Sequence, residues 1–171
     1  RGGMTPSLVV IHYTAISCAE ARLRLCDPAT EVSAHWLISE TGTTEALVDE
    51  ALRAWHAGAG QWGGRDDINS QSIGIELAND GHQPFSEPQI SALEHLLRDI
   101  MARWSIPPHR VIGHSDMAPC RKSDPGPHFD WLRLARQGLS VWPEPAHPDA
   151  PLDASLTRIG YPDAPPDIRL A

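Results

Sequence analysis

Two runs of consecutive apolar residues predict strands that are buried on both faces. Residues 7–13 read Ser-Leu-Val-Val-Ile-His-Tyr, and residues 72–77 read Ser-Ile-Gly-Ile-Glu-Leu. Both runs are rich in β-branched residues and lack the polar alternation of a half-exposed strand, which is typical of central strands in a covered sheet. A shorter apolar run at 110–113 predicts one more strand.

Other patterns in the chain predict a hairpin and short helices. The turn Glu40-Thr-Gly-Thr43 lies between residues 34–39 and 45–48, so these two ranges are expected to pair as a hairpin with glycine in the turn. Residues 19–26 have helix-forming composition, and this helix is expected to end before Pro28, because proline disfavours the α conformation of the preceding residue. A further short helix is expected at 129–136.

The clearest helical periodicity begins after Ser86. Apolar residues recur there at steps of three and four, as on the buried face of an amphipathic helix, until Pro107 and Pro108 interrupt the pattern. Ser86 and Gln89 are expected to form a capping box at the helix start. The apolar stripe consists of Ile90, Leu93, Leu97, Ile100, Met101 and Trp104.

Strands that alternate with helices predict an α/β fold, with a single domain in which helices flank a central mixed β-sheet. Residues 55–69 and 114–127 are expected to be long loops, and long ordered loops are often functional. Beyond residue 142 the composition changes, with seven prolines from Pro143 onward. We therefore expect a folded domain at 1–142 and a Pro-rich tail at 143–171 that wraps the surface or acts as a linker.

Composition and charge narrow the function classes. The chain has 171 residues, of which 41% are hydrophobic, so one domain can bury a core without further cross-links. The net charge of −8 is unsuited to a polyanion, which argues against nucleic acid as a partner. No stretch approaches about 18 consecutive apolar residues, so no transmembrane segment is expected.

The three cysteines are expected to be free thiols. Cys18, Cys26 and Cys120 are odd in number and lack the close spacing of a thiolate zinc site or a redox pair. Free thiols favour a reducing compartment, and the residues after Arg1 do not resemble a secretory signal. These observations favour a cytoplasmic protein, with the periplasm or cell envelope as the alternative.

Three residues have the chemistry of a hydrolytic zinc site. His12 lies at the carboxyl end of one predicted strand, and His114 and Asp124 lie in the loop after another, at the edge where open α/β sheets build their sites. A hydrolytic zinc ion has three nitrogen or oxygen ligands and keeps a fourth position for water. Two imidazoles and a carboxylate meet this need, although a single histidine is more often an ordinary core or surface residue.

Lys122 and Glu76 are candidates for the chemistry at such a site. Lys122 shares a proline-stiffened loop with Asp124, so its ammonium is either a solvated charge or a donor to the oxyanion of amide hydrolysis. Glu76 lies in an apolar strand, where a carboxylate is unfavourable unless it is paired, protonated or near a metal. It is expected to act as a general base, and the alternative is a structural glutamate bonded to backbone donors or an arginine.

Five short motifs follow one another along the chain and cover much of residues 7–142. Together they resemble the AmpD and AmiD type of N-acetylmuramoyl-L-alanine amidase, which has a peptidoglycan recognition protein-like fold. The resemblance implies one zinc ion on His12, His114 and Asp124. It also implies catalytic roles for Glu76 and Lys122. The motifs are Ile11-His-Tyr-Thr14, Ser33-Ala-His-Trp36, Ala54-Trp-His-Ala-Gly58, Asn69-x-x-Ser-Ile-Gly-Ile-Glu76 and Gly113-His-Ser-Asp-x-Ala-Pro-x-Arg-Lys-x-Asp-Pro-Gly-Pro127.

The same resemblance implies a substrate and its contacts. The substrate would be a peptidoglycan fragment, a muropeptide or anhydro-muropeptide, cut between the muramic acid and L-alanine. Trp55 and His56 would line the cleft, and Asn79 would have a lesser role there. Arg121 would meet a substrate carboxylate, which a planar guanidinium does well.

The end of the chain resembles the AmiD type in particular. In that type a small helical peptidoglycan-binding module follows the catalytic domain, which would here be residues 1–142. Only the start of such a module fits before Ala171. The tail at 143–171 is therefore interpreted as a remnant or as the start of a truncated module.

Two other function classes are alternatives to an amidase. Peptidoglycan recognition proteins have a similar fold and some bind without cutting, but such binders lack part of the ligand set that is present here. A zinc peptidase acting on the stem peptide is the second alternative. For an amidase, the substrate would be either a small anhydro-muropeptide or polymeric wall.

Overall fold

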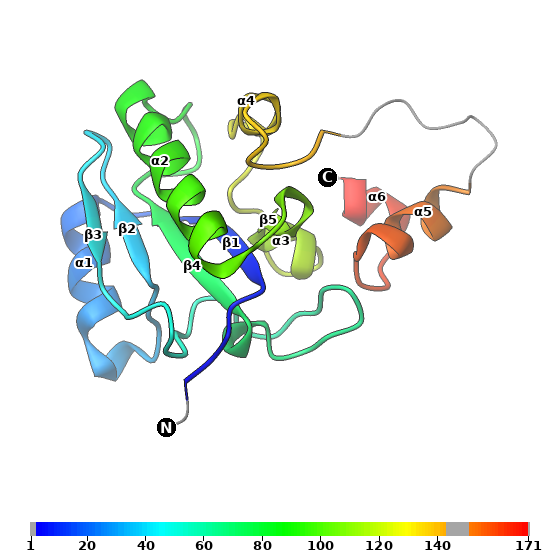
Figure 1. Cartoon of the computed structure of the whole chain (residues 1–171), viewed down its shortest axis with the longest axis horizontal. Coiled ribbons are helices and arrows are strands. Elements are labelled where there is room, and N and C mark those ends of the chain that lie inside the picture. The colour runs from blue at the N-terminus through cyan, green and yellow to red at the C-terminus, as the bar shows by residue number, and fades with distance from the viewer. Residues whose placement is uncertain (1–2, 143–150, 171) are drawn as a thin grey trace.

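A five-stranded sheet forms the centre of the molecule (Figure 1). A computed structural model describes residues 3–142 and 151–170. The strand order is β3-β2-β4-β1-β5, and each neighbouring pair is parallel except β2 with β3. This arrangement confirms the predicted mixed sheet, including the hairpin. The strands are β1 (Leu8–Tyr13), β2 (Trp36–Ile38), β3 (Thr44–Ala46), β4 (Ser72–Leu77) and β5 (Val111–Gly113).

Both faces of this sheet are covered. The apolar stripe of α2 (Glu87–Trp104) packs against alternate residues of β1 and β4, and Figure 1 shows α2 lying across that face. On the opposite face, Leu8 and Val10 pack with Met117 of α3 (His114–Met117). The other helices are α1 (Cys18–Cys26), α4 (Trp131–Arg136), α5 (Leu152–Ile159) and α6 (Pro166–Leu170). The two predicted short helices are thus confirmed as α1 and α4.

The register of β1 and β4 brings two polar residues together. His12 of β1 is paired with Glu76 of β4. Successive residues of a strand point to opposite faces of the sheet, and the preceding residues, Ile11 and Ile75, both pack in the cluster beneath α2. His12 and Glu76 therefore point away from α2, toward the face that carries α3.

The start of α2 differs from the predicted capping box. Ser86 caps the helix, since its hydroxyl accepts a hydrogen bond from the backbone N–H of Gln89. The Gln89 side chain does not return this bond. Instead it is buried and donates to the carbonyls of Ile38 and Ala78, each at 3.0 Å. Gln89 therefore ties α2 to the sheet, because satisfying two buried carbonyls stabilises the fold more than a second cap bond at the surface.

The predicted loop at 114–127 contains one turn of helix, α3, which the sequence analysis missed. The carboxylate of Asp116 accepts a hydrogen bond of 2.7 Å from the backbone N–H of Gly113, just before the helix. A carboxylate at this position satisfies a free N–H at a helix start. The turn sets the direction in which His114 leaves β5.

The tail contains two helices among the residues that the structure describes. Arg169 of α6 is buried. It donates to the hydroxyl of Thr157 in α5 at 3.5 Å, which joins the two helices, and to the carboxylate of Asp163 in the connection between them at 2.9 Å. The part of the predicted linker at 143–150 lies outside the described residues. The interpretation of the tail as part of a binding module stays a prediction. None of the described helices is both long and apolar enough to cross a membrane.

Candidate metal centre

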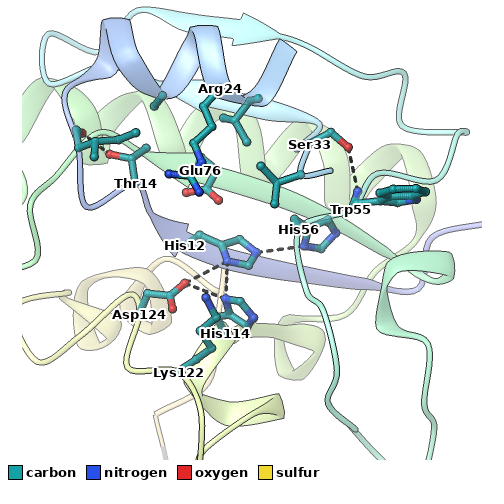
Figure 2. A pocket seen from close by; sticks show the side chains of 14 residues that line it. His12, Thr14, Arg24, Ser33, Trp55, His56, Glu76, His114, Lys122 and Asp124 are labelled. Carbon is teal, nitrogen blue, oxygen red and sulfur yellow. Dashed lines mark hydrogen bonds and ion pairs between the residues drawn. The ribbon is translucent and has the colours of Figure 1, made fainter. Parts of the chain in front are cut away.

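Three buried side chains converge at the carboxyl ends of β1 and β5 (Figure 2). The Nδ1 atoms of His12 and His114 are 2.9 Å apart, and each lies 3.0 Å from Oδ2 of Asp124. Ligand atoms around a tetrahedral zinc ion are separated by about 3.3 Å, given metal–ligand distances of roughly 2.0–2.1 Å. The three atoms thus fit one small divalent ion, which confirms that the predicted triad forms a group able to hold a metal.

The topology explains why these residues meet. β1 and β5 are parallel neighbours, so His12 near the end of β1 and His114 directly after β5 lie at the same edge of the sheet. Asp124 is ten residues further along, and its carbonyl accepts a hydrogen bond of 2.9 Å from the N–H of Ser115. This bond folds the loop back onto α3 and brings the carboxylate to the two imidazoles.

A chain of hydrogen bonds selects the tautomer of His12. The Ser72 hydroxyl donates to the carbonyl of Ile68 at 2.6 Å, so its oxygen accepts from Nε2–H of His56, 3.3 Å away. Nδ1 of His56 then accepts from Nε2–H of His12, at 3.0 Å. The remaining nitrogen of His12, Nδ1, carries a lone pair directed at the other two ligand atoms. A partner on the distant ring nitrogen is the usual way in which a protein orients a metal-binding histidine.

His114 is oriented in the same manner by the backbone. Its Nε2–H donates to the carbonyl of Ala57 at 2.7 Å, which leaves the lone pair on Nδ1. The backbone of His56 and Ala57 is held in turn by Asn69, whose Oδ1 accepts from the backbone N–H groups of both residues. The loop at 55–69 therefore supports both histidines of the triad.

The protonation states also suit a cation. Burial lowers the pKa of His12 to about 4, and the neighbouring His114 acts in the same direction, against the opposing effect of Asp124. Burial alone would raise the pKa of Asp124, but the adjacent rings of His114 and His12 bring it well below its usual range. Neutral imidazoles and an ionised carboxylate are the forms that bind metals.

Glu76 lies in the wall of the same cavity, whose volume is ≈ 160 Å³. Its Oε2 atom is buried and has no hydrogen-bond partner among the described residues. Burial and the charge of Asp124 raise the pKa of Glu76 to about 8, whereas Lys122 opposes the shift. Lys122 is exposed and lines the cavity too. An unpaired carboxyl with a pKa near neutrality is suited to proton transfer, so the structural alternative for Glu76, with backbone or arginine partners, finds no support here.

The sequence analysis missed the contribution of α1 to the cavity. Arg24 of α1 points toward Glu76 (Figure 2), and Leu25 and Val32 also line the wall. The side chain of Arg24 has no hydrogen-bond or ion-pair partner within residues 3–142 and 151–170, whereas that of Arg22 on the same helix pairs with Glu45 at 2.7 Å. The helix was predicted from the sequence. Which of its two arginines would have an ion-pair partner was not, because that depends on residues that only the tertiary structure brings near.

Trp55 and His56 were predicted to line the cleft, and both border the cavity. The Trp55 side chain is 44% exposed, and its backbone N–H donates to the hydroxyl of Ser33. His56 is buried, and both of its ring nitrogens have partners, as described above. Its place in the structure is thus support for His12, while direct contact with a substrate stays a prediction.

Arg121 and Asn79 have local partners that account for their positions. The guanidinium of Arg121 donates to the carbonyls of Ala57 and Ala59, and it borders a second cavity beside the triad. The buried side chain of Asn79 bonds the backbone of residues 81–83. Both organise loops near the site, and their predicted substrate contacts stay predictions.

Gly74 of β4 makes room for the ring of His56. A Cβ atom at this position would lie 2.3 Å from Cγ of His56. We expect Gly74→Ala to destabilise the protein by about 1–3 kcal/mol, because the buried ring has to shift. Chemical denaturation checks this value. Gly3→Ala is the control, since its Cβ would meet only one backbone oxygen at 3.4 Å. Equal stability of the two variants would contradict the packing described here.

Comparison with known proteins places this geometry in context. Residues 2–127 match the family described as N-acetylmuramoyl-L-alanine amidase. The chain is 39% identical to the N-acetylmuramoyl-L-alanine amidase AmiD of Escherichia coli, over 94% of this chain and 68% of that protein. It is 44% identical to the 1,6-anhydro-N-acetylmuramyl-L-alanine amidase AmpD of Haemophilus influenzae, over 60% of this chain but only 56% of that protein.

Solved structures of amidases from the same family have a similar fold. The E. coli AmiD complex with anhydro-N-acetylmuramic acid-L-Ala-D-γ-Glu-L-Lys superposes with a TM-score of 0.84 at 38% identity, and covers 94% of this chain and 74% of that one. AmpDH3 from Pseudomonas aeruginosa superposes with a TM-score of 0.86 at 32% identity, and covers 95% and 76%. A further AmpDH3 structure contains an anhydromuramic pentapeptide, with a TM-score of 0.85, 31% identity, and 95% and 76% coverage.

Proposed function

The chain belongs to the N-acetylmuramoyl-L-alanine amidase family, and we propose that it is a zinc-dependent enzyme that hydrolyses the amide bond between N-acetylmuramic or anhydro-N-acetylmuramic acid and L-alanine. The convergence of His12, His114 and Asp124 beside the unpaired Glu76 carries this proposal. The muropeptides in the AmiD and AmpDH3 structures support fragments of peptidoglycan as substrates.

The donor set favours zinc over other common divalent ions. Two neutral imidazoles and one carboxylate are typical of hydrolytic zinc, whereas magnesium and calcium prefer sites made of oxygen alone. Zinc bound here would polarise the amide carbonyl and make water more acidic. A recognition protein without activity is disfavoured, because the ligands, Glu76 and Lys122 are all present.

Residues around the triad would supply proton transfer, charge stabilisation and substrate contact. In its ionised form, Glu76 would accept a proton from the attacking water and deliver it to the leaving nitrogen of L-alanine, and its raised pKa makes it a stronger base than an ordinary carboxylate. The ammonium of Lys122 would stabilise the negative charge that develops on the carbonyl oxygen. The exposed indole face of Trp55 offers a surface for the sugar or the peptide.

Mass spectrometry of the products tests the proposed reaction. Incubation with an anhydro-muropeptide should release a stem peptide that begins with L-alanine, together with the free sugar moiety. Cleavage between two amino acids would instead indicate the peptidase alternative. Parallel assays with intact sacculi would show whether polymeric wall is also a substrate.

Arg24 is expected to bind a carboxylate of the stem peptide. A γ-linked D-glutamate, as in the peptide bound to AmiD, keeps a free α-carboxylate, and Arg24 is an unpaired cation in the cavity wall. We expect Arg24→Gln to lower kcat/KM about 10- to 100-fold, the loss of one charge-assisted hydrogen bond. A substrate amidated at that carboxylate should be cut equally by both enzymes. Arg22→Gln is the matched control, and a similar loss in that variant would argue against a specific role for Arg24.

A further inference from the structure

Tyr161 connects the tail to α3 by a hydrogen bond. The hydroxyl of Tyr161, just after α5, donates to Oδ1 of Asp116 in α3 at 2.5 Å. The other oxygen of this carboxylate, Oδ2, accepts from the N–H of Gly113. Asp116 thus links the tail to the residue that directly precedes His114.

An aromatic contact accompanies this hydrogen bond. The rings of Tyr161 and Trp62 pack edge to face, with centroids 5.0 Å apart. Beside them, the N–H of Gly63 donates to the carbonyl of Gly160 at 2.8 Å. Gly160 has a φ of +134°, and a Cβ there would lie 2.8 Å from the Trp62 ring, so the chain can approach this closely only with glycine. The contact is therefore built from several matched parts.

The loop that carries Trp62 packs on α3 as well. The N–H of Gln61 donates to the carbonyl of Met117 at 2.9 Å, and Trp62 and Met117 are buried in the same apolar cluster. Tyr161 packs against this cluster from the outside. The tail, the loop at 60–65 and α3 are consequently held against one another.

We propose that Tyr161 is a positioning residue for the metal centre. The tail would then contribute to metal binding by the domain that holds the triad. This inference rests on the proposed function of the triad. By bonding one oxygen of Asp116, Tyr161 keeps the carboxylate turned so that the other oxygen holds Gly113, and with it the turn that aims His114. Without the hydroxyl, Oδ1 of a partly buried carboxylate loses its partner, and α3 has to move to expose it to water.

Tyr161→Phe tests the proposal in the full chain, because it removes only the hydroxyl and keeps the ring against Trp62. We expect the affinity for Zn²⁺, measured by competition with a fluorescent chelator, to fall on the order of tenfold, as is common when a residue that orients a metal ligand is changed. The melting temperature of the metal-free protein should fall by roughly 3–8 °C. In an Asp116→Ala background the same substitution should change neither quantity.

Arg158→Gln is the matched control, since Arg158 is exposed on α5, the helix that precedes Tyr161. It should leave Zn²⁺ affinity and melting temperature as in the wild type. A Tyr161→Phe protein that melts earlier but binds Zn²⁺ with wild-type affinity would overturn the proposal, because the contact would then only stabilise the fold. Wild-type protein that bound no Zn²⁺ would contradict the proposed function instead, so the two failures are distinguishable.

Discussion

Glu76→Gln is expected to abolish most amide hydrolysis while the protein still binds zinc. The substitution preserves the size of the side chain but removes its ability to exchange a proton. A positioned general acid–base group contributes about 10²- to 10⁴-fold to a rate, so kcat on an anhydro-muropeptide should fall by about that factor. Chromatographic assay of the freed stem peptide gives kcat, and elemental analysis gives the zinc content.

The retained metal is the discriminating part of this result. Glu76 points into the cavity, but its oxygens are not among the three atoms that converge, so the triad should be intact in the variant. Glu40→Gln, in the exposed turn between β2 and β3, is the control and should match the wild type. If Glu76→Gln were fully active, the proposed proton transfer would be wrong. Loss of zinc from this variant would show that Glu76 is a ligand.

Asp124→Ala is expected to lose the metal itself. Removing the carboxylate leaves two neutral imidazoles, and each ligand of a zinc site accounts for a substantial share of a total binding energy of roughly 10–16 kcal/mol. We expect Zn²⁺ affinity to fall by about a hundredfold or more, with activity falling in parallel. His114→Ala should behave in the same way. Chelator competition measures the affinity, and added Zn²⁺ should restore only part of the activity.

Asp99→Ala is the control for this loss, because Asp99 is exposed on α2 at a distance from the triad. It should keep wild-type affinity. Undiminished Zn²⁺ binding by Asp124→Ala would exclude Asp124 as a ligand. Together these variants separate catalysis from metal binding. Glu76→Gln should lose activity alone, whereas Asp124→Ala should lose both activity and zinc.

Several elements were predictable because their causes are local. The apolar runs of β1 and β4 contain enough β-branched residues to mark them as buried strands, and the stripe of α2 repeats over eighteen residues. Glu76 could be singled out from the sequence because a carboxylate in a buried apolar strand is unfavourable unless it is paired, protonated or near a metal. The predicted capping box at Ser86 was wrong in one of its two bonds, the one from the Gln89 side chain, because that side chain has partners outside its local segment. The Gln89 side chain instead bonds the carbonyls of Ile38, in β2, and Ala78, just after β4, and its neighbours in the sequence do not reveal these partners.

By itself, the sequence determined the strands, the long helix and the family motifs, because each depends on residues close together in the chain. It predicted the triad only through the motifs in which His12, His114 and Asp124 lie. Only the tertiary structure decided which imidazole nitrogens face the centre of the triad, since His56 and Ala57 set the tautomers from more than forty residues away. It likewise decided that Arg24 is unpaired and that Tyr161 meets Asp116, forty-five residues apart. Contacts of this kind arise only when packing brings remote segments together, and a local pattern does not encode them.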